Sequence, residues 1–592
     1  MLSLLNTTFT NTLRQGFTLV GSLLSKLKAR STYFENQAGT KDTLKDLDSE
    51  GLLEKASIIT TPTAYSDGLL HSVKPEQNLG SELAVNGGFA TDSDWNKAAS
   101  WSISNNSAIS DGTQSVGTLT QNTTSLAGKY FIEFQLKEYT QGNVGMSITG
   151  TGGQDIRVTN GVLGFYNTTI TTPTDNFQIE IKGDSNFIGS IDNVSVKEVI
   201  GADFTFTRND AGTRVNASGN IESVGVDLPR IDYRGGCGSL LLEPQATNTA
   251  TDSNDFTTGD IFVSSGNPGV DNGILTSAQA TSLDGTNNAW KLVDNNDGSI
   301  GTVSFRFYSV NVTADNYNTV SLFVKKQGDN DWFYINVRDY DFSANSTWFD
   351  IANGTLGNVG SDVTASIDDY GSGWYRISLT FQTTTDTRGS IQFRLATSNG
   401  ATTILRDGTN GAYIYGLQAE SHATREYATS YIPTSGSPIT RAADIAIKDG
   451  LSSYISSTEG VLYLEISALV SEDSSTRIIS LNDGGNINRV FIGFLSSGRT
   501  YSAINNQPVA YFTPTDPTVF HKVAIKYEDN NTKFFANGNQ IGSTETTQTV
   551  PSGLSQIRFT DGGTSNPFYG NVKCIAVFKE ALTDAELTAL TS

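Results

Sequence analysis

The sequence predicts an all-β protein of tandem β-sandwich (jelly-roll) domains behind a small mixed helical N-terminal segment. The first observation is composition: 58 Gly, 30 Phe and 22 Tyr suit turns and half-buried pleated surfaces. The second is that only 17% of the residues are charged, against roughly 25% in an ordinary globular protein. The third is that short alternating apolar segments recur between Gly, Asn and Asp turns. At about 100–200 residues per domain, a chain of 592 residues has room for three or four domains.

Residues 1–77 form the expected N-terminal segment. Its apolar residues recur at intervals of three and four, which predicts one face of a helix: Phe17, Val20, Leu23, Leu24 and Leu27. A segment this short has little core of its own, so we expect it to attach the protein to a larger body. Its basic residues follow the apolar ones, which argues against a secretory signal. No apolar run reaches ~18 residues, so no membrane insertion is expected.

Residues 78–200 are expected to form the first sandwich, because apolar residues alternate in its closing strand between Ile191 and Val196. The segments ELAVNGGF and SIDNVSVKEV, together with Trp95 and Trp101, resemble the galactose-binding-like jelly rolls of carbohydrate-binding modules and phage fibres. The resemblance implies that Trp95 or Trp101 stacks on a sugar ring. Packing in the core is the commoner fate of a Trp beside a strand and is the other interpretation for both side chains.

Residues 201–248 and 427–446 are expected to be packed connectors. They are irregular but rich in groups that form ion pairs and hydrogen bonds: Arg208, Arg214, Arg230, Asp232, Tyr233, Arg441 and Asp444. Guanidinium groups bind carboxylates and backbone carbonyls, so we expect these residues to fix the orientation between domains. The segments TRVNASGNIE, PRIDY and YATSYIPTSGSPITRAADIA resemble connectors that recur in bacteriophage fibre-like virion proteins.

Residues 249–426 are expected to form the second sandwich. The segments SLFVKK, GSGWYRISLTF and AYIYGLQAE, in this order, resemble a jelly-roll domain that is common in phage head-fibre and tail-fibre proteins. The aromatic segment DWFYINVRDYDF offers Trp332 and Tyr340 as stacking faces for a sugar. Its carboxylates are either candidates for the acid pair of a glycosidase or solvated strand ends: Asp331, Asp339 and Asp341.

Residues 447–592 are expected to form the third sandwich. Asn537 and Gly538 separate two strands with the chemistry of a type I′ hairpin turn. Thr583 and Glu586 have the spacing of a capping box, which predicts a short C-terminal helix.

The segments GVLYLEISAL, NRVFIGFLSSG and GNVKCIAVFKEALTDAELTAL resemble, in this order, a concanavalin A-like or laminin G-like lectin sandwich. Loop aromatics of this region, Tyr501 and Tyr511, are further candidates for stacking on a sugar. Cys574 lies in an alternating strand and is expected to be a small buried apolar residue.

The charges and motifs exclude several classes of function. A net charge of -22 repels phosphate backbones, so nucleic acid is not an expected partner. The three histidines have no metal-ligand spacing, and nucleophile elbows, P-loops and dinucleotide motifs are absent from the sequence. We therefore expect no enzymatic activity and no cofactor. Ca²⁺ is left open because acidic loops offer oxygen ligands.

The resemblance to phage fibres implies a structural virion protein, fibre-like or capsid-attached, that adheres to host-surface polysaccharide. Its expected partners are other virion proteins (capsid, portal or tail), bound through the N-terminal region, and copies of itself, with a trimer favoured. Three alternatives remain: a virion-borne polysaccharide depolymerase, a capsid decoration protein without a ligand, and a secreted bacterial glycan-binding adhesin.

Overall fold

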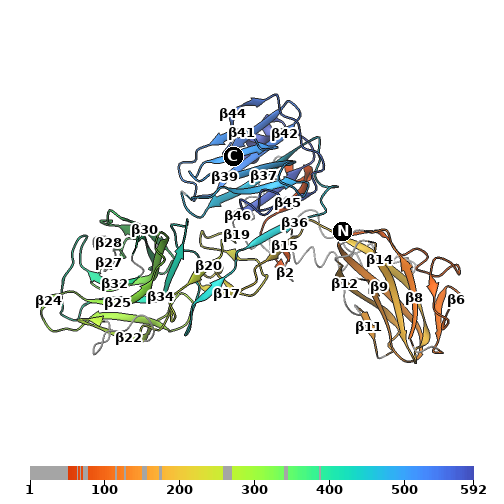
Figure 1. Ribbon diagram of the computed structural model, residues 1–592, viewed down its shortest axis with the longest axis horizontal. Helices are drawn as coiled ribbons and strands as arrows, with labels where there is room; N and C mark the ends of the chain where they lie inside the picture. The colour runs from red at the N-terminus through yellow and green to blue at the C-terminus, as the bar shows by residue number, and fades with distance from the viewer. Residues whose placement is uncertain are drawn as a thin grey trace, which may run out of the picture. The chain divides into compact units, whose positions relative to one another are not determined.

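The chain is described here from a computed structural model (Figure 1). The structure describes residues 51–592 apart from short gaps at 63–64, 67–68, 71, 73–77, 114–115, 126–127, 150–155, 160, 173–175, 258–269, 339–344, 386–387 and 472. The helix expected near residues 17–27 lies outside the described residues. Strands dominate the described residues, whose two helices are α3 (Leu52–Lys55) and α4 (Asp584–Thr591). The all-β class is therefore confirmed. Neither helix has the length and apolar character needed to cross a membrane.

The chain folds into two compact units. The smaller unit is the continuous segment Pro75–Ala202. The larger unit combines Met1–Lys74 with Asp203–Ser592. The smaller unit is therefore an insertion within the sequence of the larger one.

The smaller unit is a sandwich of two antiparallel sheets. One sheet has the order β11 (Ile156–Val158), β10 (Val144–Ile148), β13 (Gln178–Asp184), β8 (Val116–Asn122) and β5 (Asn96–Lys97). The other has the order β12 (Gly164–Thr172), β9 (Gly128–Gln141), β14 (Ile188–Ile200), β7 (Ser107–Asp111) and β6 (Trp101–Ser104), with β4 (Asn78–Glu82) paired to β14. Alternate residues of each sheet point inward, so Ile179 and Ile181 meet Ile132 and Phe134 in one core.

A second sandwich, which we call the middle sandwich, lies in the larger unit. Its first sheet has the order β21 (Val270–Asp271), β25 (Ser304–Asn311), β32 (Arg388–Ala396), β27 (Trp332–Arg338), β28 (Asn345–Asp350) and β29 (Thr355–Leu356). Its second sheet has the order β22 (Gly273–Ala280), β23 (Ala289–Asp294), β34 (Asn410–His422), β26 (Tyr317–Gly328), β31 (Trp374–Gln382) and β30 (Val363–Asp369). A short pair, β24 (Ile300–Gly301) and β33 (Ile404–Leu405), lies beside them.

A third sandwich, which we call the C-terminal sandwich, has two larger sheets. The eight-stranded sheet has the order β18 (Ile231–Asp232), β19 (Ser239–Leu242), β46 (Gly570–Phe578), β37 (Glu459–Ala468), β42 (His521–Glu528), β43 (Thr532–Ala536) and β44 (Asn539–Glu545), with β1 (Ala56–Thr60) paired to β46. The nine-stranded sheet has the order β2 (Tyr65–Ser66), β3 (Leu69–Leu70), β15 (Phe204–Thr207), β36 (Ile445–Lys448), β45 (Gln556–Arg558), β38 (Arg477–Asn482), β39 (Arg489–Phe494), β40 (Thr500–Ile504) and β41 (Gln507–Phe512).

Segments that the sequence assigns to the N-terminal segment and the first connector contribute strands to the C-terminal sandwich. In β1, Ile59 lies opposite Ala576, and in β19, Leu240 lies opposite Val572. Strand β15 pairs with β3 on one side and β36 on the other. Alternation within a segment predicts a strand but not its partner, so the sequence could not assign these strands to their distant partners.

The C-terminal sandwich is interrupted twice, each time between paired strands. The smaller unit leaves the sheet after β3 and returns before β15. The middle sandwich leaves after β20 (Ala246–Asn248) and returns before β35 (Ile439–Arg441), and these strands pair with each other. The first connector also contains a hairpin of β16 (Gly212–Val215) and β17 (Ile221–Val224).

The local expectations for the C-terminal sandwich are confirmed. Thr583 and Glu586 form the capping box of α4, and Asn537 and Gly538 have the positive φ angles of a type I′ turn, 46° and 79°. Helices α3 and α4 pack on the outer side of the eight-stranded sheet, where Cys574 is fully buried. Burial raises the pKa of this thiol.

Candidate functional site

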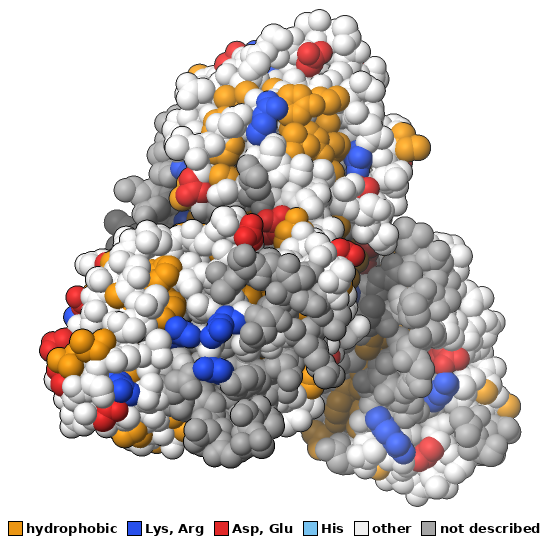
Figure 2. Space-filling view, turned by 60° about the vertical axis from the view of Figure 1, so that its left-hand side comes forward, with side chains coloured by type: hydrophobic (Ala, Val, Ile, Leu, Met, Phe, Trp, Pro, Cys, Tyr) orange, Lys and Arg blue, Asp and Glu red, His pale blue; other side chains and the backbone are white. Residues whose placement is uncertain are grey.

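The outer side of the first sheet of the middle sandwich gathers arginine, amide and aromatic side chains. In β27, Phe333 and Ile335 are fully buried in the core. Tyr334 and the other alternate residues of this strand therefore point to the opposite side. The pairing registers of β25, β32 and β28 show that residues of four neighbouring strands share this side of the sheet. We call the following set the arginine face: Arg306, Tyr334, Asn336, Arg338, Gln392 and Arg394. Figure 2 shows several Lys or Arg side chains close together on this sandwich, at the lower left of the view.

Aromatic rings hold the centre of the arginine face in place. Tyr334 stacks on Trp348 of β28, with ring centroids 5.0 Å apart and an interplanar angle of 15°. The Arg394 guanidinium lies 5.4 Å from the Tyr334 centroid, and its Nη1 donates a hydrogen bond of 2.7 Å to the Tyr334 hydroxyl. Trp348 Nε1 donates to the Ala401 carbonyl at 2.8 Å. Burial raises the pKa of Tyr334, so this hydroxyl stays neutral.

Polar groups of the arginine face keep unused hydrogen-bonding capacity. Arg394 donates to the Gln392 Oε1, and Asn336 Nδ2 donates to Ser346 Oγ at 2.9 Å. In the described part of the chain, no hydrogen-bond partner reaches Gln392 Nε2, Asn336 Oδ1 or Arg394 Nε, although all three atoms are buried. Buried polar groups are nearly always paired, so these three atoms are exceptions within the sandwich.

The sequence-predicted residues of this region lie partly on this side of the sheet. Trp332 is half-buried on β27, on the same side as Tyr334. Tyr340 lies outside the described residues, as do Asp339 and Asp341. Asp331 directly precedes β27 and forms an ion pair with Lys326. Sequence reasoning missed Tyr334, which is two residues after Trp332, and a test for alternation would have found it.

A second candidate lies on the outer side of the nine-stranded sheet of the C-terminal sandwich. Tyr501 of β40 lies directly opposite Tyr511 of β41, and the rings are nearly parallel at 12° with centroids 6.2 Å apart. The Arg499 guanidinium lies 4.8 Å from the Tyr511 centroid. Phe491 of β39 meets Tyr501 edge-on at 5.3 Å. We call these four residues the aromatic face. In the upper part of Figure 2, a hydrophobic patch bordered by Lys or Arg side chains lies on this sandwich.

The members of the aromatic face differ in exposure. Tyr511 is 41% exposed, whereas Tyr501 is 9% and Phe491 3% exposed. Burial raises the pKa of Tyr501 to about 12. Tyr511 therefore offers the accessible ring, which lies beside the ring of Tyr501, and Phe491 packs against Tyr501.

The tryptophans of the smaller unit do not offer stacking faces, which corrects the expectation for Trp95 and Trp101. They are 6% and 4% exposed and belong to the core. The Trp95 ring meets Phe89 at 5.5 Å, and the Trp101 ring meets Phe187 at 5.9 Å. Because apolar neighbours cover both rings, a sugar has no access to them.

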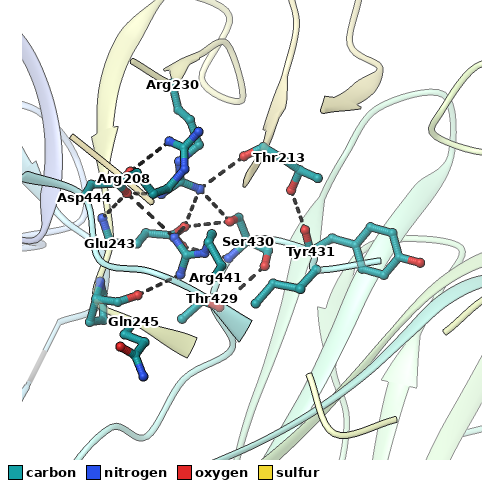
Figure 3. A network of polar contacts seen from close by, with 12 residues as sticks. Arg208, Thr213, Arg230, Glu243, Gln245, Thr429, Ser430, Tyr431, Arg441 and Asp444 are labelled. Carbon is teal, nitrogen blue, oxygen red and sulfur yellow. Dashed lines mark hydrogen bonds and ion pairs between the residues drawn. The ribbon is translucent and has the colours of Figure 1, made fainter. Parts of the chain in front are cut away.

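Four of the connector residues meet in one buried ion cluster (Figure 3). Arg208 Nη1 donates to Asp444 Oδ1 at 3.0 Å, and Arg230 also pairs with Asp444. Arg230 and Arg441 share Glu243 Oε2 at 2.7 and 2.8 Å. Burial opposes the ionisation of Glu243, but Arg441 and Arg230 outweigh it and hold its pKa well below the usual range.

The ion cluster reaches the middle sandwich through Ser430. Its hydroxyl accepts a hydrogen bond from Arg230 Nη1 at 2.7 Å, and its backbone nitrogen donates to Glu243 Oε1 at 2.7 Å. The cluster therefore ties the strands of the C-terminal sandwich to the segment that follows β34. Sequence reasoning missed Glu243, whose only signal is an acid that directly follows three leucines.

The remaining connector residues lie outside this cluster. Arg214 pairs with Glu222 across the β16–β17 hairpin at 2.7 Å. Asp232 accepts the Val215 backbone N–H at 2.7 Å, and burial raises its pKa. The Tyr233 backbone nitrogen donates to the Val215 carbonyl at 2.9 Å. These contacts hold the hairpin against β18.

A polar cleft of about 460 Å³ lies where the first connector, the middle sandwich and the C-terminal sandwich meet. Its lining includes Tyr370, Tyr427 and Phe520. Arg234 in this cleft lies 5.5 Å from the Tyr370 centroid and 3.5 Å from the Asp368 carboxylate. The described residues include no group of three or more His, Cys, Asp or Glu side chains placed to hold a metal ion.

Comparison with known proteins yields one family match. A model of the concanavalin A-like lectin/glucanases superfamily matches residues 465–588. No curated protein matches the chain.

Solved structures match the chain only at low similarity. The CBM40 of a Ruminococcus gnavus IT-sialidase, bound to alpha2,3 sialyllactose, is 18% identical over 23% of this chain and 84% of that chain, with a TM-score of 0.21. The CBM22-1–CBM22-2 tandem of Paenibacillus barcinonensis Xyn10C is 10% identical over 58% and 98%, with a TM-score of 0.20. The Trypanosoma rangeli sialidase is 9% identical over 90% and 96%, with a TM-score of 0.22. Scores this low carry no argument about a ligand or an activity. The similarity that holds is that of residues 465–588 to the concanavalin A-like lectin/glucanase domains, as their strand order predicts.

Proposed function

We propose that the protein is a non-enzymatic structural component of a bacteriophage particle that adheres to host-surface polysaccharide through its C-terminal sandwich. The observation that carries glycan binding is the exposed ring of Tyr511, held parallel to Tyr501 on the outer side of a sandwich whose family description includes lectins. A rigid aromatic face with a polar rim suits a sugar ring, which has an apolar face and hydroxyl edges.

The family description also includes glucanases, and the carboxylates here favour binding over hydrolysis. A glycosidase needs two carboxyl groups about 5–10 Å apart across the substrate. Asp561 is the carboxylate that contacts Arg489, the neighbour of the aromatic face on β39, at 3.8 Å, and it is only 5% exposed. A buried carboxylate beside an arginine is poorly placed to donate or accept a proton from a ligand.

The location on a virion, the attachment through the N-terminal region and the trimer are parts of the proposal supported by the sequence resemblance to phage fibres. A calcium ion is left open by the acidic loops, which offer oxygen ligands. Clustering of copies would raise the avidity of weak single sites by about 10²–10⁴.

The first prediction tests the aromatic face with the full chain and the Tyr511→Ala variant. We expect saturable binding to host cells that periodate treatment of their glycans abolishes, and an affinity at least about tenfold lower for the variant, because its stacking ring is gone. Fluorescence titration of labelled protein on cells measures both.

Phe165→Ala is the matched control, because Phe165 is an exposed aromatic (53%) in the smaller unit. Equal loss in both variants, or binding that survives periodate, would contradict the proposal. Shortening of the polymer during prolonged incubation would favour the depolymerase instead. Failure to find the chain in purified particles would exclude the virion role without affecting glycan binding.

A further inference from the structure

We infer that the polar cleft between the first connector, the middle sandwich and the C-terminal sandwich binds a short neutral oligosaccharide. The inference rests on the proposed function in that the ligand is a glycan, but it concerns a different place in the chain. The cleft has a volume of about 460 Å³, within the range of about 300–1,000 Å³ that small-molecule sites occupy. It therefore has the size of a ligand site.

The groups that line the cleft are accessible to a ligand. The side chain of Arg234 is 47% exposed and that of Asp368 is 37% exposed. Ser471 and Thr518 of the lining are exposed hydroxyl residues. Three aromatic residues of the lining are half-buried: Tyr370, Tyr427 and Phe520. A ligand in the cleft therefore meets charged groups, hydroxyls and aromatic rings together.

The charged groups of the lining favour a neutral ligand. The lining contains three arginines and three acids, so their formal charges cancel: Arg214, Arg234, Arg376, Asp232, Glu243 and Asp368. A lining without net charge gives an ionic ligand little attraction. The ligand that fits best is therefore uncharged and carries its own hydrogen-bonding groups.

Arg234 and Asp368 form a pair that a sugar hydroxyl can join. The Arg234 Nη2 donates to Asp368 Oδ1 at 3.5 Å, and its Nη1 donates to the Tyr370 hydroxyl at 3.4 Å. Strong charge-assisted hydrogen bonds are about 2.7–2.9 Å long, so both charged groups keep capacity for a shorter bond. A hydroxyl both donates and accepts, so it can accept from Arg234 and donate to Asp368 at once.

Cations restrain two of the aromatic rings that line the cleft. The Arg234 guanidinium lies 5.5 Å from the Tyr370 centroid, and Lys573 Nζ lies 4.0 Å from the Phe520 centroid. Aromatic rings with polar groups around them suit a sugar, which has an apolar face and hydroxyl edges.

The two sandwiches are joined at the cleft itself. Glu243 and Ser430 both belong to the lining, and the Ser430 backbone nitrogen donates to Glu243 Oε1 at 2.7 Å (Figure 3). Both residues also contact Arg230 in the buried ion cluster. The walls are therefore fixed before a ligand arrives, which lowers the entropy cost of binding.

The test probes an array of neutral and acidic oligosaccharides with the full chain and then titrates the tightest-binding neutral one by calorimetry. We expect saturable binding of a neutral oligosaccharide with an affinity that is insensitive to salt, because the ligand carries no charge. An array without neutral binders, or with acidic binders alone, would overturn the inference.

Arg234→Ala and Asp368→Ala should each lower the affinity for this oligosaccharide at least about tenfold, because each removes a charged hydrogen-bonding group. The matched controls are Arg558→Ala and Asp449→Ala, which break a surface pair of similar length, 3.4 Å, elsewhere in the C-terminal sandwich. The controls should leave the affinity unchanged. An equal loss in the controls would contradict a site in the cleft.

Thr518→Trp tests the cleft without removing a charge. Thr518 is an exposed residue of the lining, so a larger side chain there narrows the cleft and leaves the core intact. We expect a loss of affinity of at least about tenfold, and full affinity in this variant would overturn the inference.

Tyr511→Ala separates the cleft from the aromatic face and should retain oligosaccharide binding. Binding that is lost in Tyr511→Ala but kept in Arg234→Ala would place the ligand on the aromatic face and overturn the inference. Failure of the cleft therefore shows in the titrations of Arg234→Ala, and failure of the proposed function shows in the cell binding of Tyr511→Ala.

Discussion

At the scale of single residues, the buried ion cluster combines three cations with two carboxylates. Arg208, Arg230 and Arg441 are at most 1% exposed. They form ion pairs with the carboxylates of Glu243 and Asp444. Removing one carboxylate leaves guanidinium charge buried without a partner, which costs far more than the pair contributes. The sequence predicted that the arginines and Asp444 fix the orientation between domains, because guanidinium groups in an irregular segment can bind carboxylates and backbone carbonyls. It did not predict that they meet at a single point.

A residue-scale prediction is that Asp444→Asn lowers the stability of the larger unit by about 3–5 kcal/mol. The reason is that Asp444 accepts hydrogen bonds from both Arg208 and Arg230 and from the Glu243 backbone nitrogen. The urea midpoint, followed by circular dichroism, measures the loss. Asp449→Asn is the control, because Asp449 lies at the surface, 3.4 Å from Arg558, and should change stability by less than about 0.5 kcal/mol. Similar midpoints for both variants would contradict the role of the cluster.

At the scale of elements, alternation predicted strands well and their partners poorly. In β14, the apolar residues Ile191, Val194 and Val196 are buried as expected, and the step of three between the first two coincides with a register shift between Asp192 and Ser195. Such patterns are local and can be found in the sequence. The pairing of β1 with β46 joins segments that are far apart in the sequence. Backbone hydrogen bonds leave no trace in side-chain spacing, so the sequence does not reveal this pairing.

An element-scale prediction is that β1 is integral to the C-terminal sandwich. Ile59→Ala should destabilise it by about 2–5 kcal/mol, because the side chain is fully buried against the eight-stranded sheet and its removal leaves a cavity. Val226→Ala, at a residue 53% exposed, should cost less than about 0.5 kcal/mol. Thermal unfolding of both variants compares them, and an unchanged midpoint for Ile59→Ala would show that β1 adds nothing to the sheet.

At the scale of the whole molecule, the chain is a C-terminal sandwich with two insertions instead of three sandwiches in a row. Sequence order could not predict this arrangement, since each insertion has the complete strand pattern of a separate domain. The same limit applies to the candidate sites. Alternation places Tyr334 on the side of Trp332, but only the fold shows that β32 brings Arg394 and Gln392 beside them.

A whole-molecule prediction is that residues 75–202 can be replaced by a short Gly-Ser linker without unfolding the rest. The ends to be joined are already close, because Ser72 donates its backbone N–H to the Asp203 carboxylate at 2.7 Å. The unfolding temperature of the larger unit should change by less than about 3 °C in calorimetry. Aggregation or loss of the cooperative transition would show that the larger unit depends on its insertion.

The pairing of β20 with β35 has a mechanical consequence. A domain in the middle of a string transmits tension through one covalent link on each side, whereas the middle sandwich is joined to the C-terminal sandwich by two chain crossings that lie side by side. A pull on the middle sandwich is therefore divided between two strands. We expect a chain built this way to resist shear better than a linear one of the same domains.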